Sequence, residues 1–438
     1  MRVLLALSLL AWPGAAEEPP LVLRDAVQLA VAHHQDVAKA KASAEALKGK
    51  IREVRSQALP DVKFALDATR WRDPSLLNAS GINNFPDYLQ QALIPSAVNL
   101  FDYSLTVKQP LFTQGKIGTA LRLANIEAEG ALSEIDRAEQ DVALATVKAF
   151  YGLLWAEQSR SLVVETQEQK KLHAEMARTR YRNGVATEVD VLRSEVAVAN
   201  GQPDLVRAEN AIKQARAELN YYLGRPLDFA TRLAGNFQEM PWEQNDLTEL
   251  TNDAMRRRPE IERLRIAERS ASTQLELARA EDRIRMDFTG SYGLMARLPQ
   301  NLVNSEFIRW SAGINFTFPV FDGFKRSGLV TQALASQRIA RLDREKFEQQ
   351  VRLAIQQAYD DLRSAQESIA AAKATVSEAE RVLAMMQDNY KYGAATTLDI
   401  ADAETAVSVA RGNLLRGLYD YSASRANLRW SIGQTPWE

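Results

Sequence analysis

Four segments of the chain alternate between apolar and polar side chains, as a β-strand does when one of its faces is apolar and the other polar. The segments run from Val62 to Thr69, from Phe101 to Lys108, from Met286 to Leu294 and from Arg309 to Phe318. A tilted strand needs about nine to eleven residues to cross a bilayer, and each segment is close to that length. The alternative, an edge of a soluble β-sandwich, requires a second sheet, which the rest of the chain does not offer. The pattern therefore predicts two pairs of membrane-crossing strands.

The remainder of the chain has a helical period. No proline occurs from Lys116 to Arg182, and small apolar residues recur there at alternating steps of three and four. A seam of small residues lets facing helices approach closely, and a 3.5-residue period predicts left-handed supercoiling. A helix over this range is about 100 Å long at 1.5 Å per residue. The range from Lys325 to Lys391 predicts a second helix of the same length.

Four shorter helices are predicted beside these two long ones, with Pro60 and Gly224 among the residues that end them. They cover Asp36 to Leu59, Thr187 to Leu223, Pro259 to Ile284 and Thr396 to Ile432. Each long helix would lie antiparallel to two stacked shorter helices. Between the second and the third of these shorter helices, residues 225–246 contain Pro226, Gly235 and Pro241 and are predicted to have little regular structure.

The same plan occurs twice along the chain. Pro110 and Pro319 follow a strand at equivalent places, and they are 209 positions apart, as are Tyr181 and Tyr390. Upstream, Asp36 and Glu260 are 224 positions apart, because the loop between the first two strands is longer. We expect a first repeat over 17–224, a linker over 225–246 and a second repeat over 247–438.

The first residues resemble a secretory signal peptide. Arg2 precedes the apolar run from Val3 to Trp12, and Gly14-Ala15-Ala16 supplies the small residues that a signal peptidase recognises. The run is shorter than the roughly 20 apolar residues of a transmembrane helix. We predict cleavage after Ala16 and export from the cytoplasm.

Composition excludes several classes of site. The 438 residues contain no cysteine, so disulfides, thiolate metal sites and a lipidated cysteine are absent. A net charge of −2, from 54 basic and 56 acidic residues, gives no reason to expect nucleic acid as a partner. We find no catalytic motif and expect no metal, no cofactor and no enzymatic activity. The run Arg256-Arg257-Arg258 is interpreted as a solvated helix end.

Four strands cannot close a membrane barrel, because the smallest such barrels have about eight. Two copies would give eight strands around a filled interior, whereas three would give about twelve and leave a water-filled passage. The predicted fold class is mainly α with a membrane β-barrel: long antiparallel helical hairpins form an α-barrel, and four strands per chain contribute to a 12-stranded trimeric β-barrel. Aromatic residues near the strand ends are predicted to form a girdle against the lipid: Trp71, Tyr103, Trp310 and Phe318.

These features together resemble the TolC family of outer-membrane efflux proteins, over nearly all of the chain after the leader. The resemblance rests on the duplicated Pro-[Leu/Val]-Phe-x-x-Gly boundary, on the two Gly turns followed by Thr and then Asp190 or Asp399, and on the pairs Leu223-Gly224 and Ile432-Gly433. It implies a homotrimer in the lipid of the bacterial outer membrane, with its helical part in the periplasm. It also implies docking to a periplasmic adaptor protein and an inner-membrane pump.

The resemblance further implies two groups of site residues. The periplasmic gate would contain Asp399, Asp402, Asp190 and Tyr390. The hairpin tips that contact the adaptor would contain Asn183, Gly184, Val185, Tyr392, Gly393 and Ala394. The family's latch arginine falls on Ala395 and a polar neighbour falls on Val189, so the latch is expected to differ here. Solvated aspartates and ordinary helix C-caps are the alternative interpretations of these residues.

The leading functional hypothesis is a passive exit duct of a tripartite pump that expels drugs, metals or other small molecules. The exit duct of a type I protein secretion system has the same architecture and is an alternative. A periplasmic coiled-coil scaffold without a pore is a third hypothesis, against which the alternating strands argue.

Overall fold

The structure is a computed structural model that describes residues 19–72, 86–89, 97–237, 239 and 246–437. The predicted signal peptide and Pro241 lie outside the described residues. The chain divides into two compact units. The first contains the described residues of Met1–Ala42, Ser133–Glu262 and Glu345–Glu438, and the second contains Ser43–Leu132 and Arg263–Arg344. Each unit therefore combines segments of both sequence repeats.

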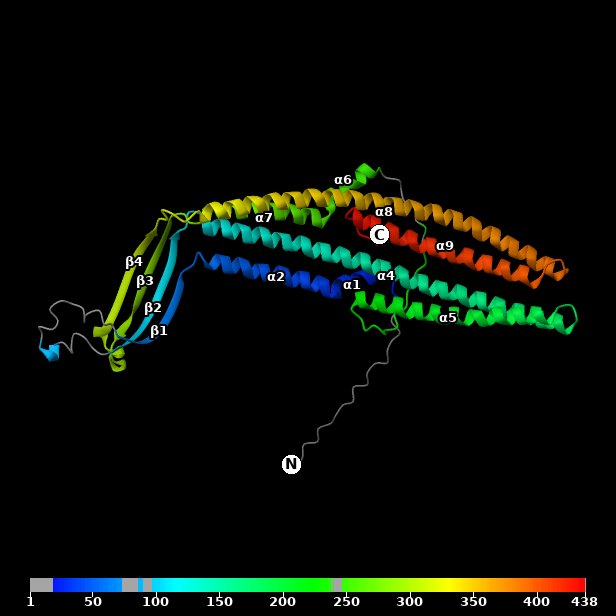
Figure 1. Cartoon of the computed structure of the whole chain (residues 1–438), viewed down its shortest axis with the longest axis horizontal. Helices are drawn as coiled ribbons and strands as arrows, with labels where there is room; N and C mark the ends of the chain where they lie inside the picture. Colours follow the sequence, from blue (N-terminus) through cyan, green and yellow to red (C-terminus); the bar gives the residue numbers. More distant parts are fainter. Residues whose placement is uncertain (1–18, 73–85, 90–96, 238, 240–245, 438) are drawn as a thin grey trace, which may run out of the picture. The chain divides into compact units, whose positions relative to one another are not determined.

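The four predicted strands form one antiparallel sheet in the second unit, and they lie side by side in chain order (Figure 1). They are β1 (Asp61–Trp71), β2 (Val98–Phe112), β3 (Arg285–Ala296) and β4 (Ile308–Thr317). Two short 3-10 helices, η3 (Pro299–Val303) and η4 (Ser305–Phe307), connect β3 to β4. The prediction of four strands is confirmed.

The register gives this sheet one polar and one apolar face. Thr106 lies opposite Lys63 on one side and Ser291 on the other. The next residue, Leu105, lies opposite Phe64 and Tyr292. Because successive side chains point to opposite faces of a sheet, the alternation in the sequence becomes a continuous separation of polar from apolar side chains across all four strands.

Both long helices begin and end at the predicted residues, as α4 (Lys116–Arg182) and α8 (Lys325–Lys391). The shorter helices are α2 (Gln35–Ser56), α5 (Glu188–Leu223), α7 (Pro259–Ala280) and α9 (Thr397–Ser431). The predicted ends of α2 and α7 were too late. A turn over Gln57–Leu59 ends α2 before Pro60, and the positive φ of Asp282, 52°, interrupts the helical backbone after α7.

None of the described helices is both long enough and apolar enough to cross a membrane.

Among the described α-helices, α1 (Leu23–His33) and α6 (Leu247–Arg257) were not predicted, and both belong to the first unit. Their bounds are 224 positions apart at both ends, so they are copies of one element. Each has one buried apolar face. Ala30 of α1 packs in a cluster with Leu153 and Leu219, and Ala254 of α6 packs in a cluster with Ile355 and Leu428. The two repeats therefore build equivalent clusters in the first unit, and a third cluster joins Val147 of the first repeat to Ala426 of the second.

Arg258 corrects the interpretation of the arginine run as a solvated helix end. Arg256 and Arg257 are exposed, but the Arg258 side chain is only 5% exposed and donates to Glu260 over 2.6 Å. Its guanidinium also lies 4.5 Å from the centre of the Trp430 ring. The Arg258 side chain is buried because of its position in the chain. It is the C-cap of α6, immediately before Pro259 and α7, where the chain passes through the core.

Candidate functional site at the hairpin tips

In the first unit, α4 with α5 and α8 with α9 form two helical hairpins whose turns lie at one end (Figure 1). Gly184 and Gly393 occupy the left-handed region, with φ of 73° and 77°. In the first turn Val185 N–H donates to Arg180 O and Gly184 N–H donates to Tyr181 O. These two hydrogen bonds form a Schellman motif, in which glycine avoids the strain of a Cβ at positive φ. Both glycines thus have a structural role.

All six residues predicted to contact an adaptor lie at these turns and are exposed: Asn183, Gly184, Val185, Tyr392, Gly393 and Ala394. Tyr392 is the extreme case, because 89% of its surface is accessible. Their exposure leaves them available to a partner, and the adaptor contact stays a prediction.

A capping box begins the second helix of each hairpin. The Thr187 hydroxyl accepts from Asp190 N–H, and the Asp190 carboxylate accepts in return from Thr187 N–H. Thr396 and Asp399 form the same reciprocal pair at α9. Two orphan N–H groups of each helix terminus are satisfied in this way. Asp190 and Asp399, both predicted gate residues, therefore stabilise their own helices.

Asp190 also joins the two hairpins. Its second carboxylate oxygen, Oδ1, accepts from the Thr397 hydroxyl over 2.7 Å. The hydroxyl of Thr187, its backbone N–H and the hydroxyl of Thr397 all donate to this carboxylate, so the pKa of Asp190 is lowered. The structure thus places Asp190 between the two hairpins, and its role in a gate stays a prediction.

Tyr390 forms a second connection between the hairpins. Arg180 of α4 donates from Nη1 to Tyr390 O over 2.9 Å, and its guanidinium lies 4.2 Å from the centre of the Tyr390 ring. The Tyr390 side chain is only 8% exposed. A cation over an aromatic ring contributes roughly 0.5–2 kcal/mol, with the larger values at desolvated sites. Arg180 therefore attaches the end of the first hairpin to the end of the second.

Sequence reasoning missed Arg180 and Thr397. It looked for an arginine at position 395, where alanine stands, and it assigned no partner to Asp190 across the hairpins. The contacts span 210 and 207 positions of sequence. No local spacing relates these residues, and only the packing of one hairpin on the other brings them together.

Asp399 and Asp402 lie in the first two turns of α9 and both are exposed. Hydrogen bonds from the Thr396 backbone N–H and hydroxyl lower the pKa of Asp399, so it is charged at neutral pH. The structure assigns no capping or ion-pair role to Asp402 among the described residues. Their place in the gate stays a prediction.

A cavity of about 340 Å³ lies beside these contacts. Its lining includes His173, Arg193, Asn200, Thr397 and Glu404. His173 is 6% exposed, and neither of its ring nitrogens has a hydrogen-bond partner among the described residues. Its ring centre lies 5.9 Å from that of Tyr390. Nowhere in the described part of the chain do three or more His, Cys, Asp or Glu side chains gather to hold a metal.

We expect acid to loosen the joined tips through His173. Burial lowers the pKa of its imidazole below the ordinary value of 6.5, so the closed arrangement favours the neutral ring. That stability is present above pH 6.5 and is lost as the pH falls through the lowered pKa. Single-channel conductance should therefore rise with acidification in this window, and His173→Phe should remove the dependence.

Other groups around His173 act differently. Lys170 and Arg193 line the same cavity. The lowered pKa of Asp190 places the effect of its carboxyl at a lower pH. Burial raises the pKa of Glu404, so protonating that carboxyl favours the closed arrangement. An unaltered pH profile in His173→Phe would contradict the assignment to His173.

The sheet carries the second predicted site, the aromatic girdle. Phe64, Leu105, Tyr292 and Trp310 lie directly opposite one another across all four strands and form one apolar row with three aromatic rings. Tyr103 lies on the same face, next to this row, and its hydroxyl donates to Leu302 O. The predicted girdle residues Tyr103 and Trp310 thus lie at neighbouring heights, on the face predicted to meet lipid.

Phe318 and Trp71 occupy different places. Phe318 follows the last residue of β4, at the opposite end of the strand from Trp310, and is 68% exposed. Trp71 is four residues from Asp67 on β1, so it shares the polar face. The register therefore corrects the predicted girdle at Trp71, which does not lie on the face of the other three residues.

Known proteins resemble the chain over most of its length. The family described as "Outer membrane efflux protein" matches residues 26–225 and 250–434. Outer membrane protein TolC of Escherichia coli is 24% identical over 458 residues, which cover 99% of this chain and 86% of that protein. Alkaline protease secretion protein AprF of Pseudomonas aeruginosa is 23% identical over 387 residues, with 86% of this chain and 77% of that protein covered.

A solved structure has the same fold. The CmeC outer membrane channel of Campylobacter jejuni superposes with a TM-score of 0.80 at 17% identity, and 94% of this chain and 85% of that one are covered. The two family matches fall on the two repeats of the sequence. The chain therefore belongs to the outer membrane efflux protein family, as its resemblance to the TolC family predicts, and is a channel subunit of the outer membrane with its helical part in the periplasm.

Proposed function

We propose that three copies of the chain form a passive exit duct for a tripartite efflux pump, joined in the periplasm to an adaptor protein and an inner-membrane pump. The observation that carries the proposal is the strand register. It gives one four-stranded sheet with a polar face for water and an apolar face for lipid. Three such sheets supply about twelve strands, enough for a barrel with an aqueous interior.

The hairpin tips would form the periplasmic entrance of this duct. The Asp190–Thr397 and Arg180–Tyr390 contacts hold the second hairpin against the first within each copy. Opening the entrance would require these contacts to separate in all three copies. Charged side chains that line the mouth would then select among ions, because a ring of carboxylates attracts cations.

We expect Asp402→Asn to weaken block of the channel by multivalent cations. Threefold symmetry would place three Asp402 carboxylates around one mouth, and the substitution removes their charge while keeping the shape of the side chain. Asp399→Ala is a poorer test, because it also removes a capping box worth about 0.5–2 kcal/mol. The measurement is the block of planar-bilayer current by a trivalent cation, and unchanged block would exclude Asp402 from the mouth.

The proposal as a whole is tested with the purified full-length protein. Outer-membrane fractionation, mass in detergent and planar-bilayer conductance should give an outer-membrane trimer that conducts ions. A heat-modifiability gel should show a folded oligomer that becomes a monomer on boiling. A soluble monomer that does not shift on boiling and does not conduct would instead support a coiled-coil scaffold without a pore.

The exit duct of a type I protein secretion system is the second candidate function. It is favoured by the similarity to AprF, whose name describes secretion of alkaline protease. Deleting the gene in its own host separates the two functions. Increased sensitivity to small toxic compounds indicates efflux, whereas loss of a protein from the culture supernatant indicates secretion.

We also propose that the duct has no catalytic activity and no resident cofactor. The features described above serve helix capping, strand register and contact between hairpins. Energy for transport would come from the inner-membrane partner. A reaction catalysed by the purified protein alone would overturn this part of the proposal.

A further inference from the structure

Two buried polar side chains lie together near the hairpin tips without hydrogen-bond partners. His173 of α4 is 6% exposed, and neither of its ring nitrogens is hydrogen-bonded within the described residues. Tyr390 of α8 is 8% exposed, and its hydroxyl is unpaired in the same sense. The centres of the two rings lie 5.9 Å apart. Because an unpaired buried polar group costs free energy, a molecule that hydrogen-bonds to these groups would be bound favourably.

The cavity beside His173 is large enough to hold a small molecule. Its volume is about 340 Å³, and its lining comes from α4, α5 and α9 of the first unit. An apolar cavity of about 150 Å³ in another protein is sufficient to bind benzene. Most of the side chains around this cavity are polar or charged. We therefore expect a polar occupant.

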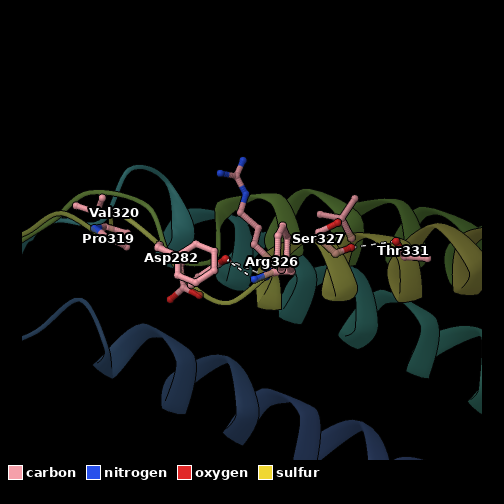
Figure 2. Close-up of a pocket in the computed structure, with 10 residues that line it drawn as sticks. Asp282, Pro319, Val320, Arg326, Ser327 and Thr331 are labelled. Carbon is pink, nitrogen blue, oxygen red and sulfur yellow. Dashed lines mark hydrogen bonds between the residues drawn. The ribbon is translucent and has the colours of Figure 1, made fainter.

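A larger hollow in the second unit lacks these features. It measures about 490 Å³ and lies at the start of α8, near Asp282 and Val320 (Figure 2). Asp282 forms an ion pair with Lys325 over 3.4 Å, and the Thr331 hydroxyl donates to Ser327 O over 3.0 Å. Within the described residues, none of its lining side chains has a buried nitrogen or oxygen without a partner. The unpaired His173 thus distinguishes the cavity at the tips.

Several polar groups of the cavity at the tips are already engaged within the protein. The Thr397 hydroxyl donates to Asp190 over 2.7 Å, and the Thr405 hydroxyl donates to Ala401 O over 2.8 Å. The Asp190 carboxylate also accepts from the backbone N–H and the hydroxyl of Thr187. Recognition of a ligand therefore depends on His173 and on the other ionisable side chains of the lining.

Those ionisable side chains favour an anion. Lys170 of α4 and Arg193 of α5 are basic, and Glu404 of α9 is the acid opposed to them. Burial raises the pKa of the Glu404 carboxyl, and the nearby charge of Lys170 lowers it to a smaller extent. Glu404 therefore accepts a proton more readily than an ordinary glutamate, which reduces its repulsion of an anion. Arginine and lysine are the side chains that most often bind phosphate groups.

The imidazole of His173 narrows the choice of anion. A neutral imidazole has one N–H donor and one acceptor nitrogen. A hydrogen phosphate group matches both, because it has acceptor oxygens and a P–O–H donor. We propose that the cavity binds a small anion with a hydrogen phosphate group, either free phosphate or a phosphate monoester. His173 would be its buried contact, and Lys170 and Arg193 would balance its charge.

A phosphate in this cavity would connect the two hairpins. The lining comes from α4 and α5 of the first hairpin and from α9 of the second, beside the contact of Asp190 with Thr397. A ligand shifts a conformational equilibrium toward the state that it binds more tightly. Phosphate would therefore favour the joined hairpins and a closed entrance. This effect rests on the proposed duct, whereas binding itself does not.

Calorimetric titration of the purified full-length protein tests the site. It is done above pH 6.5, because burial lowers the pKa of His173 and keeps its ring neutral there. Inorganic phosphate and glycerol phosphate are the two ligands, and the tighter one identifies the free ion or the monoester as the preferred class. Sulfate should bind at least about tenfold more weakly, because it has no proton to donate to the acceptor nitrogen. Equal binding of sulfate, or no binding of either phosphate, would overturn the site.

Three variants test the assigned residues. His173→Phe keeps an aromatic ring and removes both nitrogens, so phosphate should bind at least about tenfold more weakly. Lys170→Gln should also weaken binding. Lys171→Gln is its matched control, because Lys171 is the next residue of α4, pairs with Glu168 and is absent from the lining. The trimer yield in detergent checks that each variant folds. Equal affinity in all three variants would overturn the assignment.

Planar-bilayer recordings separate the effect on the entrance from the proposed function. Phosphate should lower the open fraction of the channel relative to sulfate at equal ionic strength, and His173→Phe should remove this difference. Binding of phosphate with an unchanged open fraction would overturn its effect on the entrance. A protein that conducts in neither buffer would instead overturn the proposed function, and the calorimetric result would still decide whether the site exists.

Discussion

Replacing Gly293 with alanine is expected to abolish the assembled channel. A Cβ at this position would lie 2.0 Å from Tyr103 O and 2.7 Å from the Cα of Ser104, so backbone atoms of β2 would have to move. Glycine is required because β2 approaches β3 closely here, and a side chain would separate the two central strands of the sheet. We expect a destabilisation above about 4 kcal/mol, in the range reserved for severe packing errors. The measurement is the yield of heat-modifiable trimers from outer membranes.

Gly412→Ala is the matched control. A Cβ at Gly412 meets no atom within 4 Å, and the equivalent position of the first repeat holds Pro203. Removing a glycine from the interior of α9 should stabilise that helix by roughly 0.5–1 kcal/mol. Trimers should therefore form normally in this variant. A normal yield of trimers in Gly293→Ala would mean that β2 and β3 do not pair in the register described.

The absent side chain of Gly293 also permits a longer contact. Arg309 of β4 lies opposite Gly293, and its guanidinium donates to Asp102 of β2. This ion pair passes over β3. A side chain at position 293 would obstruct the path of the Arg309 side chain. One glycine therefore permits both the close approach of two strands and an ion pair between strands that are not neighbours.

The sequence predicted the strands and the long helices because the pattern that marks each of them lies within its own residues. Alternation of side chains marks a strand, and a long proline-free seam ended by glycine marks a helix such as α4. The helices α1 and α6 were missed because each has only 11 residues, which is too short to be stable by its own sequence in water. Their buried faces against the long helices stabilise them. That packing is not visible along the chain.

The residues predicted to form the gate show the same division between local and distant signals in the sequence. Asp190 and Asp399 follow each turn at a fixed spacing, and the capping boxes confirm why that spacing recurs. Tyr390 was identified through the resemblance to a family. The contacts of Arg180 with Tyr390 and of Thr397 with Asp190 depend on the approach of two hairpins that are more than 200 positions apart in sequence. Sequence therefore predicted the tips and not the contacts between them.

Tyr390→Ala is expected to open the entrance. The substitution removes a side chain that is 8% exposed, together with the ring beneath the Arg180 guanidinium, at 4.2 Å. Truncating a buried aromatic residue to alanine costs about 3–5 kcal/mol, and here the loss falls on the closed arrangement of the hairpins. A shift of about 3 kcal/mol changes an equilibrium roughly 150-fold.

Planar-bilayer recordings of Tyr390→Ala should therefore show a much larger open fraction and higher conductance than the parent channel, with trimers still formed. Tyr392→Ala is the control, because Tyr392 lies two residues away in the same turn and is 89% exposed. Its removal leaves Arg180 stacked on Tyr390 and should not change conductance. Equal conductance in the two variants would mean that the Arg180–Tyr390 contact does not hold the entrance closed. Loss of trimers in Tyr390→Ala alone would assign the residue to folding instead of gating.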